Sequence, residues 1–207
     1  MNLLFVSLSD LHLGEEDSLL TNLSLGEPVK NPTGPGPCMM ALVNFLHSLK
    51  RDINEDNRIP YLVLNGDIIE LATSSFPVAA SYLRLFLREV VRRRIFDEVV
   101  YIAGNHDHAL WSLIRNMRFV DALGRNPAAD GMLRVSHASS LSSTWRSSVM
   151  ENLVADISRS DLKITVSNPA LRLQGWSGHE FYFHHGHFME HIYMLLTLLF
   201  ERVFTDE

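Results

Sequence analysis

Three short apolar segments, each followed directly by polar residues, constrain the fold of this chain more than any other feature. They are Asn2–Ser9, Tyr61–Asn65 and Val99–Ala103, and they are rich in Val, Ile, Leu and aromatic residues. Nearly continuous apolar runs of this length are typical of strands that are buried on both faces of a parallel sheet. We therefore expect these segments to form central parallel strands.

Helical patterns lie between the predicted strands. Apolar residues recur at a spacing of three to four in Met39–Arg51 and in Val78–Arg94, which is typical of helices with one buried face. Alternation of strand and helix predicts an α/β domain in which helices flank a layered β-sheet. The segment Leu25–Pro37 holds four prolines and three glycines, so we expect a surface loop before the first helix.

The second half of the chain shows a different succession of elements. It predicts helices around His108–Arg118 and Thr144–Ser158, followed by strands at Lys163–Val166, Leu171–Leu173 and Glu180–Phe183. A chain of 207 residues can bury a sizeable core without disulfides or a structural metal. We expect one domain over residues 1–207, in which any bound metal serves chemistry.

Composition and charge restrict the partners and the compartment. Lys and Arg number 18 against 24 Asp and Glu, a net charge of −6, so bulk charge does not favour nucleic acid as a partner. Cys38 is the single cysteine, which excludes an intrachain disulfide and favours the reducing cytoplasm. The apolar N-terminus lacks a basic leader, so we expect a strand there rather than a signal peptide. The longest apolar run, Ile192–Phe200, is shorter than the ~20 residues of a transmembrane helix.

Polar residues follow each of the three predicted strands. Because the carboxyl ends of parallel strands lie side by side, residues that follow them converge at one edge of the sheet. Mixed carboxylate, imidazole and amide donors suit Mn, Fe, Zn or Ni, whereas an all-oxygen set suits Mg or Ca. The converging residues are Asp10 and His12 after the first strand, Asp67 and Glu70 after the second, and Asn105, His106 and Asp107 after the third.

The three motifs differ in specificity. Asp-x-His is short enough to occur by chance, and Gly-Asp is more often a turn. Gly-Asn-His-Asp is stronger, because a glycine turn that presents three polar groups has little packing purpose. A fourth signal is the segment Gly178–His191, which holds five of the ten histidines. We expect either His184 or His185, at the end of a predicted strand, to be a ligand.

Together these residues resemble the calcineurin-like metallophosphoesterases, whose pattern runs D-x-H, G-D-x-x-[DE], G-N-H-[DE], a strand-end H and finally G-H-x-H. Four of the five blocks stand here in order between Asp10 and His187. The details S-D-L-H-L-G and H-G-H are most similar to the branch that contains UDP-2,3-diacylglucosamine pyrophosphatases. The resemblance implies a layered α/β fold with a metal site at the carboxyl ends of its central strands.

The resemblance also implies a set of metal ligands. Asp10 and His12 would hold one divalent ion, Asp67 would bridge two, and Asn105 with His185 would hold the other. His185 is preferred to His184 because it directly precedes glycine, as in the family's fourth block. The implied ions are most simply Mn, with Fe, Zn, Ni or Mg as alternatives.

The catalytic roles follow from the same resemblance. A metal-bridging hydroxide would attack the phosphorus of a phosphomonoester, phosphodiester or pyrophosphate. His106 would protonate the departing oxygen, Asp107 would orient its imidazole, and Glu70 would orient a metal ligand. The substrate is expected to be a phosphorylated small molecule, but the composition of the loops that would select it, Glu15–Pro37 and Met117–Ser160, names no ligand.

The chain departs from the family pattern at its last block. The sequence after Gly186 lacks the second histidine of G-H-x-H, so we expect a domain without its C-terminal part and a site that holds metal weakly. Phe188–Phe204 is apolar around most of its helical circumference. We expect this segment to pack against a missing C-terminal segment or another copy of the chain, with peripheral membrane contact as the alternative.

Two other functions stay open beside the phosphoesterase. A metal-poor binding scaffold would be expected to lose ligands throughout, whereas here the first four blocks are intact. A nuclease of the same superfamily should carry a basic, aromatic-lined groove. The cluster Arg92–Arg94 closes a predicted helix, where cations suit the dipole, and we expect only structural roles for His47, His108 and His137.

Overall fold

A five-stranded sheet forms the centre of the computed structural model, which describes residues 2–21, 23–24, 27–28, 32–55, 57–125, 143–146, 148–153 and 162–186. The strand order is β1-β4-β5-β7-β6, and only the edge strand β6 runs antiparallel to its neighbour. The strands are β1 (Phe5–Leu8), β4 (Ile59–Asn65), β5 (Phe96–Ile102), β7 (Lys163–Asn168) and β6 (Ser143–Arg146). The predicted parallel strands are therefore confirmed.

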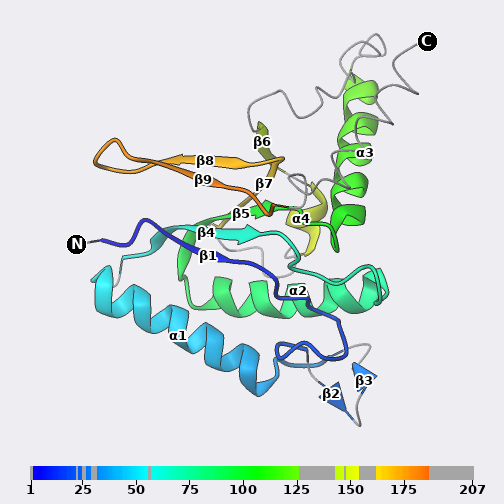
Figure 1. The fold of residues 1–207 in the computed structure, drawn as a ribbon, viewed down its shortest axis with the longest axis horizontal. Coiled ribbons are helices and arrows are strands. Elements are labelled where there is room, and N and C mark those ends of the chain that lie inside the picture. Colours follow the sequence, from blue (N-terminus) through cyan, green and yellow to red (C-terminus); the bar gives the residue numbers. More distant parts are fainter. Residues whose placement is uncertain are drawn as a thin grey trace.

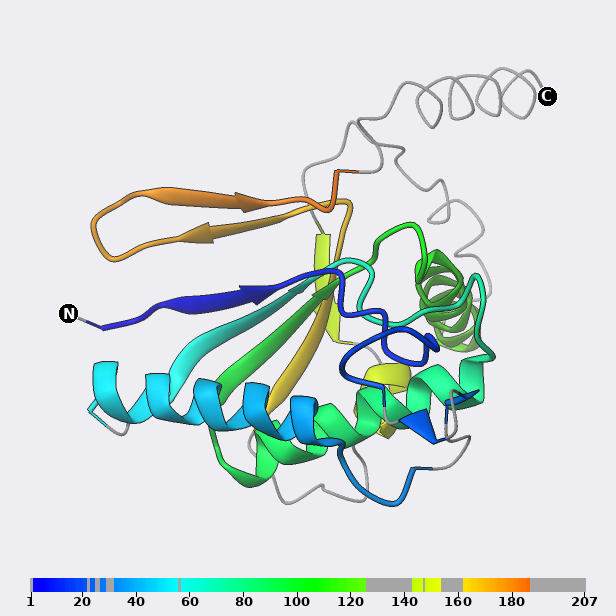
Figure 2. The same cartoon turned by 60° about the horizontal axis from the view of Figure 1, so that its bottom comes forward.

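Two helices, α1 (Pro37–Ile53) and α2 (Phe76–Arg92), cover one face of this sheet (Figures 1 and 2). Each has proline in its first turn, where the fixed φ suits a helix and no backbone donor is lost. Each carries at least one basic residue in its last turn, where positive charge suits the negative end of the helix dipole. Their apolar faces join the larger of the two core clusters among the described residues, in which Tyr82 and Phe86 are fully buried.

A hairpin of β8 (Leu171–Gln174) and β9 (Glu180–Phe183) covers the opposite face (Figure 2). Successive residues of a strand point to opposite faces, so β4 sends Leu62 and Leu64 toward the helices and Val63 toward the hairpin. The second core cluster consists of Val63, Val100, Ile102, Leu171 and Leu173. The sheet is thus buried on both sides, which explains the continuous apolar runs in its strands.

The remaining elements correct two details of the sequence interpretation. The predicted helix at Thr144–Ser158 is wrong in its first residues, because Ser143–Arg146 pairs with β7 as strand β6. Among the described residues of this range, the helix α4 covers Ser148–Leu153. The predicted loop at Leu25–Pro37 contains β3 (Glu27–Pro28). The other two elements are β2 (Leu23–Ser24), which pairs with β3, and α3 (His108–Arg125).

The architecture confirms the predicted fold class, a layered α/β sheet flanked by helices. Within the part of the chain that the structure describes, no helix combines the length and apolarity needed to cross a membrane. Strands β1, β4 and β5 end side by side, so the loops that follow them lie at the same edge of the sheet.

Candidate metal centre

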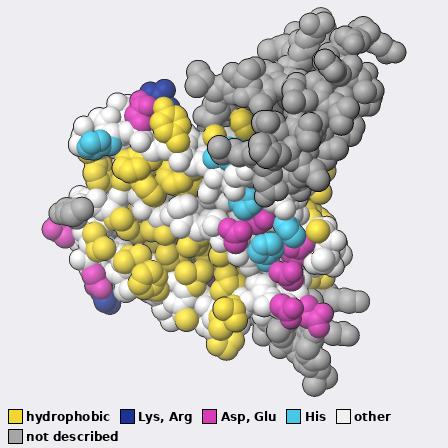
Figure 3. All heavy atoms as spheres, viewed as in Figure 1, with side chains coloured by type: hydrophobic (Ala, Val, Ile, Leu, Met, Phe, Trp, Pro, Cys, Tyr) yellow, Lys and Arg dark blue, Asp and Glu magenta, His cyan; other side chains and the backbone are white. Residues whose placement is uncertain are grey.

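The loops after β1, β4 and β5 are joined by backbone hydrogen bonds at this edge. Asp10 N donates to Gly66 O at 3.1 Å, His12 N donates to Asp67 O at 3.0 Å, and Leu71 N donates to His106 O at 3.2 Å. Histidine and acidic side chains gather in one patch on the face seen in Figure 3. Residues far apart in sequence therefore converge, as the succession of strand ends predicts.

Asp10, His12 and Asp67 form a group of potential metal ligands, because one donor atom from each lies within 4.8 Å of the others. All three have φ in the left-handed region, at 55°, 44° and 52° respectively. Such a backbone conformation is unfavourable for residues other than glycine, and it persists where the surroundings hold it. Here the backbone bonds between the loops supply that restraint, and the strained positions coincide with the donor group.

His185, which follows β9, reaches the same group from the other face of the sheet. Its Nδ1 lies 3.0 Å from the carbonyl oxygen of Asn65, and its Nε2 lies 3.1 Å from Oδ2 of Asp67. The ring fits because residue 66 is glycine, with φ of 81°, and a Cβ there would overlap it. Since a carbonyl oxygen only accepts, Nδ1 carries a proton.

This geometry provides a test of whether the residues fit a bound cation. With its proton on Nδ1, a neutral His185 ring directs the lone pair of Nε2 at the Asp67 carboxylate, which also has only lone pairs to offer. A proton or a metal ion shared by the two groups removes this conflict. Metal-ligating histidines commonly donate their other ring N–H to a backbone carbonyl, as Nδ1 of His185 does here, so the donor set fits a divalent ion.

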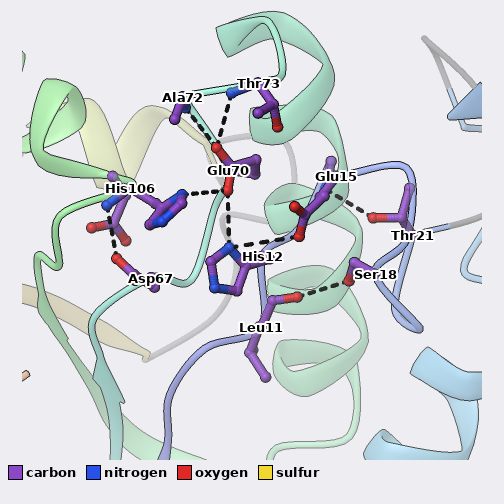
Figure 4. A network of polar contacts seen from close by, with 12 residues as sticks. Leu11, His12, Glu15, Ser18, Thr21, Asp67, Glu70, Ala72, Thr73 and His106 are labelled. Atoms are coloured by element: carbon purple, nitrogen blue, oxygen red, sulfur yellow. Dashed lines mark hydrogen bonds and ion pairs between the residues drawn. The ribbon is translucent and has the colours of Figure 1, made fainter.

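Glu70 is fully buried and sits between two histidines (Figure 4). Its Oε1 accepts from Ala72 N at 2.6 Å and from Thr73 N at 2.9 Å. Its Oε2 lies 2.9 Å from Nδ1 of His12 and 2.6 Å from Nδ1 of His106. A carboxylate held in this way orients both rings and leaves the Nε2 atom of each free for other partners.

The charges around Glu70 agree with this network. Burial acts to lower the pKa of His12, but the hydrogen bond to Glu70 and the charges of Asp67 and Glu15 raise it above its ordinary value. Burial acts to raise the pKa of Glu70, but His12 and two backbone donors lower it. Glu70 is thus an ionised acceptor for the two rings, which matches its expected orienting position.

Asp107 requires a correction, because its carboxylate does not contact the His106 imidazole. It accepts instead from Ile68 N at 3.0 Å, from Gly104 N and from the hydroxyl of Tyr101. Glu70 occupies the position beside His106 that the sequence interpretation gave to Asp107. Burial raises the pKa of Asp107 although its three donors act in the opposite direction.

The other predicted residues are placed as follows. Asn105 lies in the loop after β5 with an exposed side chain, next to His106, whose N donates to Oδ1 of Asp67 at 2.9 Å. Nδ1 of His184 accepts from Gly186 N at 2.7 Å, which is a local bond at the end of β9. His137, His187 and His191 lie outside the described residues.

Tyr101 is a buried polar residue that the sequence interpretation missed. Burial and then Asp107 raise the pKa of its hydroxyl well above the ordinary value, so the group keeps the proton that it donates. A signal was present, because a tyrosine in a strand buried on both faces needs a partner for its hydroxyl.

The sequence model of the calcineurin-like phosphoesterase family matches residues 3–204, nearly the whole chain, and this chain belongs to that family. A comparison with curated proteins gave no match. Membership implies a metal-dependent hydrolase that uses divalent ions and acts on phosphoesters. The resemblance inferred from the four blocks is confirmed at the level of the family.

Proposed function

We propose that this chain is a binuclear phosphoesterase in which Asp67 is shared between two divalent ions, most simply Mn. The observation that carries the proposal is the position of Asp67 between two donor groups. It belongs to one group with Asp10 and His12, and its Oδ2 lies 3.1 Å from His185 on the other side. A carboxylate with a separate donor group on each side is suited to bridge two cations.

In this proposal Asp10 and His12 would hold one ion, and Asn105 with His185 would hold the other. When bound, two divalent ions would supply positive charge to the phosphoryl oxygens and make a water molecule acidic enough to act as nucleophile near neutral pH. Glu70 holds the His12 ring so that Nε2 points away from the Glu70 carboxylate. The backbone oxygen of Asn65 holds the His185 ring so that Nε2 points toward Asp67.

His106 is the proposed general acid. The contact of its Nδ1 with Glu70 at 2.6 Å fixes the ring, so that a proton on Nε2 can pass to the departing oxygen. A well-placed general acid contributes roughly 10²- to 10⁴-fold to the rate. His106 is thereby oriented by Glu70, in place of the role first given to Asp107.

Several finer interpretations stay predictions. The branch of UDP-2,3-diacylglucosamine pyrophosphatases, a cytoplasmic location and self-association through Phe188–Phe204 rest on the sequence alone. The same is true of a missing C-terminal part, because residues 187–207 lie outside the described part of the chain.

The experiment that tests the proposal is metal analysis of protein purified without chelator, followed by hydrolysis assays with Mn²⁺. The substrates should include a phosphomonoester, a phosphodiester and a nucleotide-sugar pyrophosphate. We expect two ions per chain and Mn²⁺-dependent turnover that a chelator abolishes. Folded protein with neither metal nor turnover would favour the binding scaffold, and cleavage confined to nucleic acid would favour the nuclease.

A further inference from the structure

The Asp107 carboxylate joins two of the loops that carry proposed metal ligands. It is fully buried, and it accepts from Ile68 N at 3.0 Å on one side and from Gly104 N on the other. Ile68 directly follows Asp67, and Gly104 opens the loop that contains His106. One side chain therefore bridges the loop after β4 and the loop after β5.

A second link between the same loops runs in the opposite direction. His106 N donates to Oδ1 of Asp67 at 2.9 Å, and a Cβ at Gly104 would overlap the same oxygen atom. Asp67 thus lies directly against the loop after β5. With Asp107 bonded back to Ile68, the two loops are fixed to each other from both sides.

Tyr101 ties this bridge to the sheet. It is a fully buried residue of β5, and its hydroxyl donates to the same Oδ2 atom of Asp107 that accepts from Ile68 N. A strand within a sheet is more rigid than a loop, and sites supported by rigid elements hold their ligands more accurately. The carboxylate is therefore anchored to the sheet as well as to the two loops that it joins.

From these contacts we infer that the Tyr101–Asp107 pair is a positioning device, which fixes the distance of Asp67 from Asn105 and His106 and so sets the spacing of the two ions. The inference rests on the proposed function, because it assigns a role in arranging that same site. Neither residue of the pair is a catalytic residue. Asp107 acts through the backbone amides of Ile68 and Gly104, which adjoin Asp67 and Asn105, and Tyr101 acts through Asp107.

Two variants test the inference, and a third controls for loss of stability. Tyr101→Phe removes only the hydroxyl, whereas Asp107→Asn replaces one acceptor by an amino group that faces backbone donors. The control Thr165→Val removes another buried hydroxyl, which contacts Glu98 on β5 and not the loops of the site. If Asp107→Asn does not fold, Tyr101→Phe decides the question against the same control.

The first measurement uses metal-free protein and hydrogen exchange at the amides of Ile68 and Gly104. We expect faster exchange at both amides in Tyr101→Phe and Asp107→Asn, but not in Thr165→Val. The second measurement is the magnetic coupling between two bound Mn²⁺ ions in electron paramagnetic resonance spectra, which changes with their separation. We expect an altered coupling in both variants and, in Asp107→Asn, roughly 10- to 100-fold weaker Mn²⁺ binding.

The outcomes separate the inference from the proposed function. If the unmodified protein shows a coupled Mn²⁺ pair and both variants keep the same coupling, affinity and kcat, the inference is wrong and the proposed function stands. If the unmodified protein binds no coupled pair, both are wrong. Altered coupling and a lower kcat in the two variants, with both quantities unchanged in Thr165→Val, would support the positioning role over a purely structural one.

Discussion

The helix-covered face and the hairpin-covered face of the sheet bury very different amounts of apolar surface. On the helix side, α1 and α2 pack on Leu62, Leu64 and Tyr101 within the larger cluster. On the hairpin side, the cluster of the described residues has only five buried members, among them Val63 and Leu173. Since burial of a large apolar side chain contributes about 1.5–3 kcal/mol, most of the folding free energy is expected to come from the helix side.

The hairpin face makes a different contribution, because it places a residue of the candidate site. Strand β9 ends at Phe183, and two residues later His185 meets Asp67. Phe183 and Phe181 both pack edge-to-face on Phe5 of β1, with ring centroids 4.9 and 5.0 Å apart. The comparison teaches that one face mainly holds the fold, whereas the smaller face connects the fold to the metal centre.

The largest effect is expected for Asp67→Asn, because Asp67 lies between the donor group of Asp10 and His12 and the His185 ring that follows the hairpin. An amide oxygen can still accept from His106 N, so the fold should persist, but the loss of the shared charge weakens both ion sites. We expect bound metal to fall and Mn²⁺-dependent hydrolysis to disappear, as measured by metal analysis and turnover. Asp97→Asn changes an exposed carboxylate elsewhere on β5 and should change neither quantity. Unaltered metal and turnover in Asp67→Asn would contradict the shared-ion arrangement.

A somewhat smaller effect is expected for His106→Gln, because a general acid acts without holding an ion. We expect kcat to fall roughly 10²- to 10⁴-fold while the metal content stays constant. The loss should shrink for p-nitrophenyl esters, whose leaving group needs little protonation. His179→Gln, at an exposed position of the hairpin, is the matched control. An equal loss for good and poor leaving groups would instead point to a binding role for His106.

Phe86→Ala tests the helix face. Phe86 is fully buried in α2, and removal of such a ring costs about 3–5 kcal/mol of unfolding free energy. We expect this loss in urea denaturation, with metal affinity and kcat of the folded fraction unchanged. Phe45→Ala makes the same chemical change on α1 at a side chain that is 58% exposed, and should cost less than about 0.5 kcal/mol. A changed metal affinity in folded Phe86→Ala would contradict the proposal that the helix face contributes to stability and not to the metal centre.

A smaller loss of stability than that of Phe86→Ala is expected for Leu173→Ala on the hairpin face. Leu173 is 8% exposed and belongs to the smaller cluster, so the cost should be about 2 kcal/mol, at the low end for a buried leucine. Because the hairpin leads to His185, Mn²⁺ binding should weaken severalfold as well. Calorimetric titration with Mn²⁺ measures the metal affinity, and urea denaturation measures the free energy of unfolding. Lower stability with unchanged Mn²⁺ affinity would show that the hairpin does not control the position of His185.

Local signals in the sequence predicted most of the fold. Continuous apolar runs located β1, β4 and β5, and helical periodicity located α1 and α2, because strands buried on two faces and helices buried on one leave different spacings. The polar residues that follow each strand predicted the edge at which Asp10, His12 and Asp67 meet. The rule that parallel strands end side by side predicted that these residues, although distant in sequence, are close in space.

Other features depended on contacts between distant segments. The sequence does not show that Ser143–Arg146 becomes a strand, since its pairing with β7 overrides the local helical pattern. The catalytic roles that followed from the resemblance likewise made Asp107 the partner of His106, whereas the packed loops put Glu70 there and Asp107 beside Tyr101.

The sequence by itself determined which residue types stand at the strand ends, because strand formation and ligand chemistry are local properties of the chain. Only the tertiary structure decided which carboxylate faces which ring. That choice depends on how closely the loops pack, and two carboxylates in neighbouring loops are chemically alike until burial and backbone donors give each a separate position. Glu70 and Asp107 differ for this reason, although both are acidic residues within the same set of motifs.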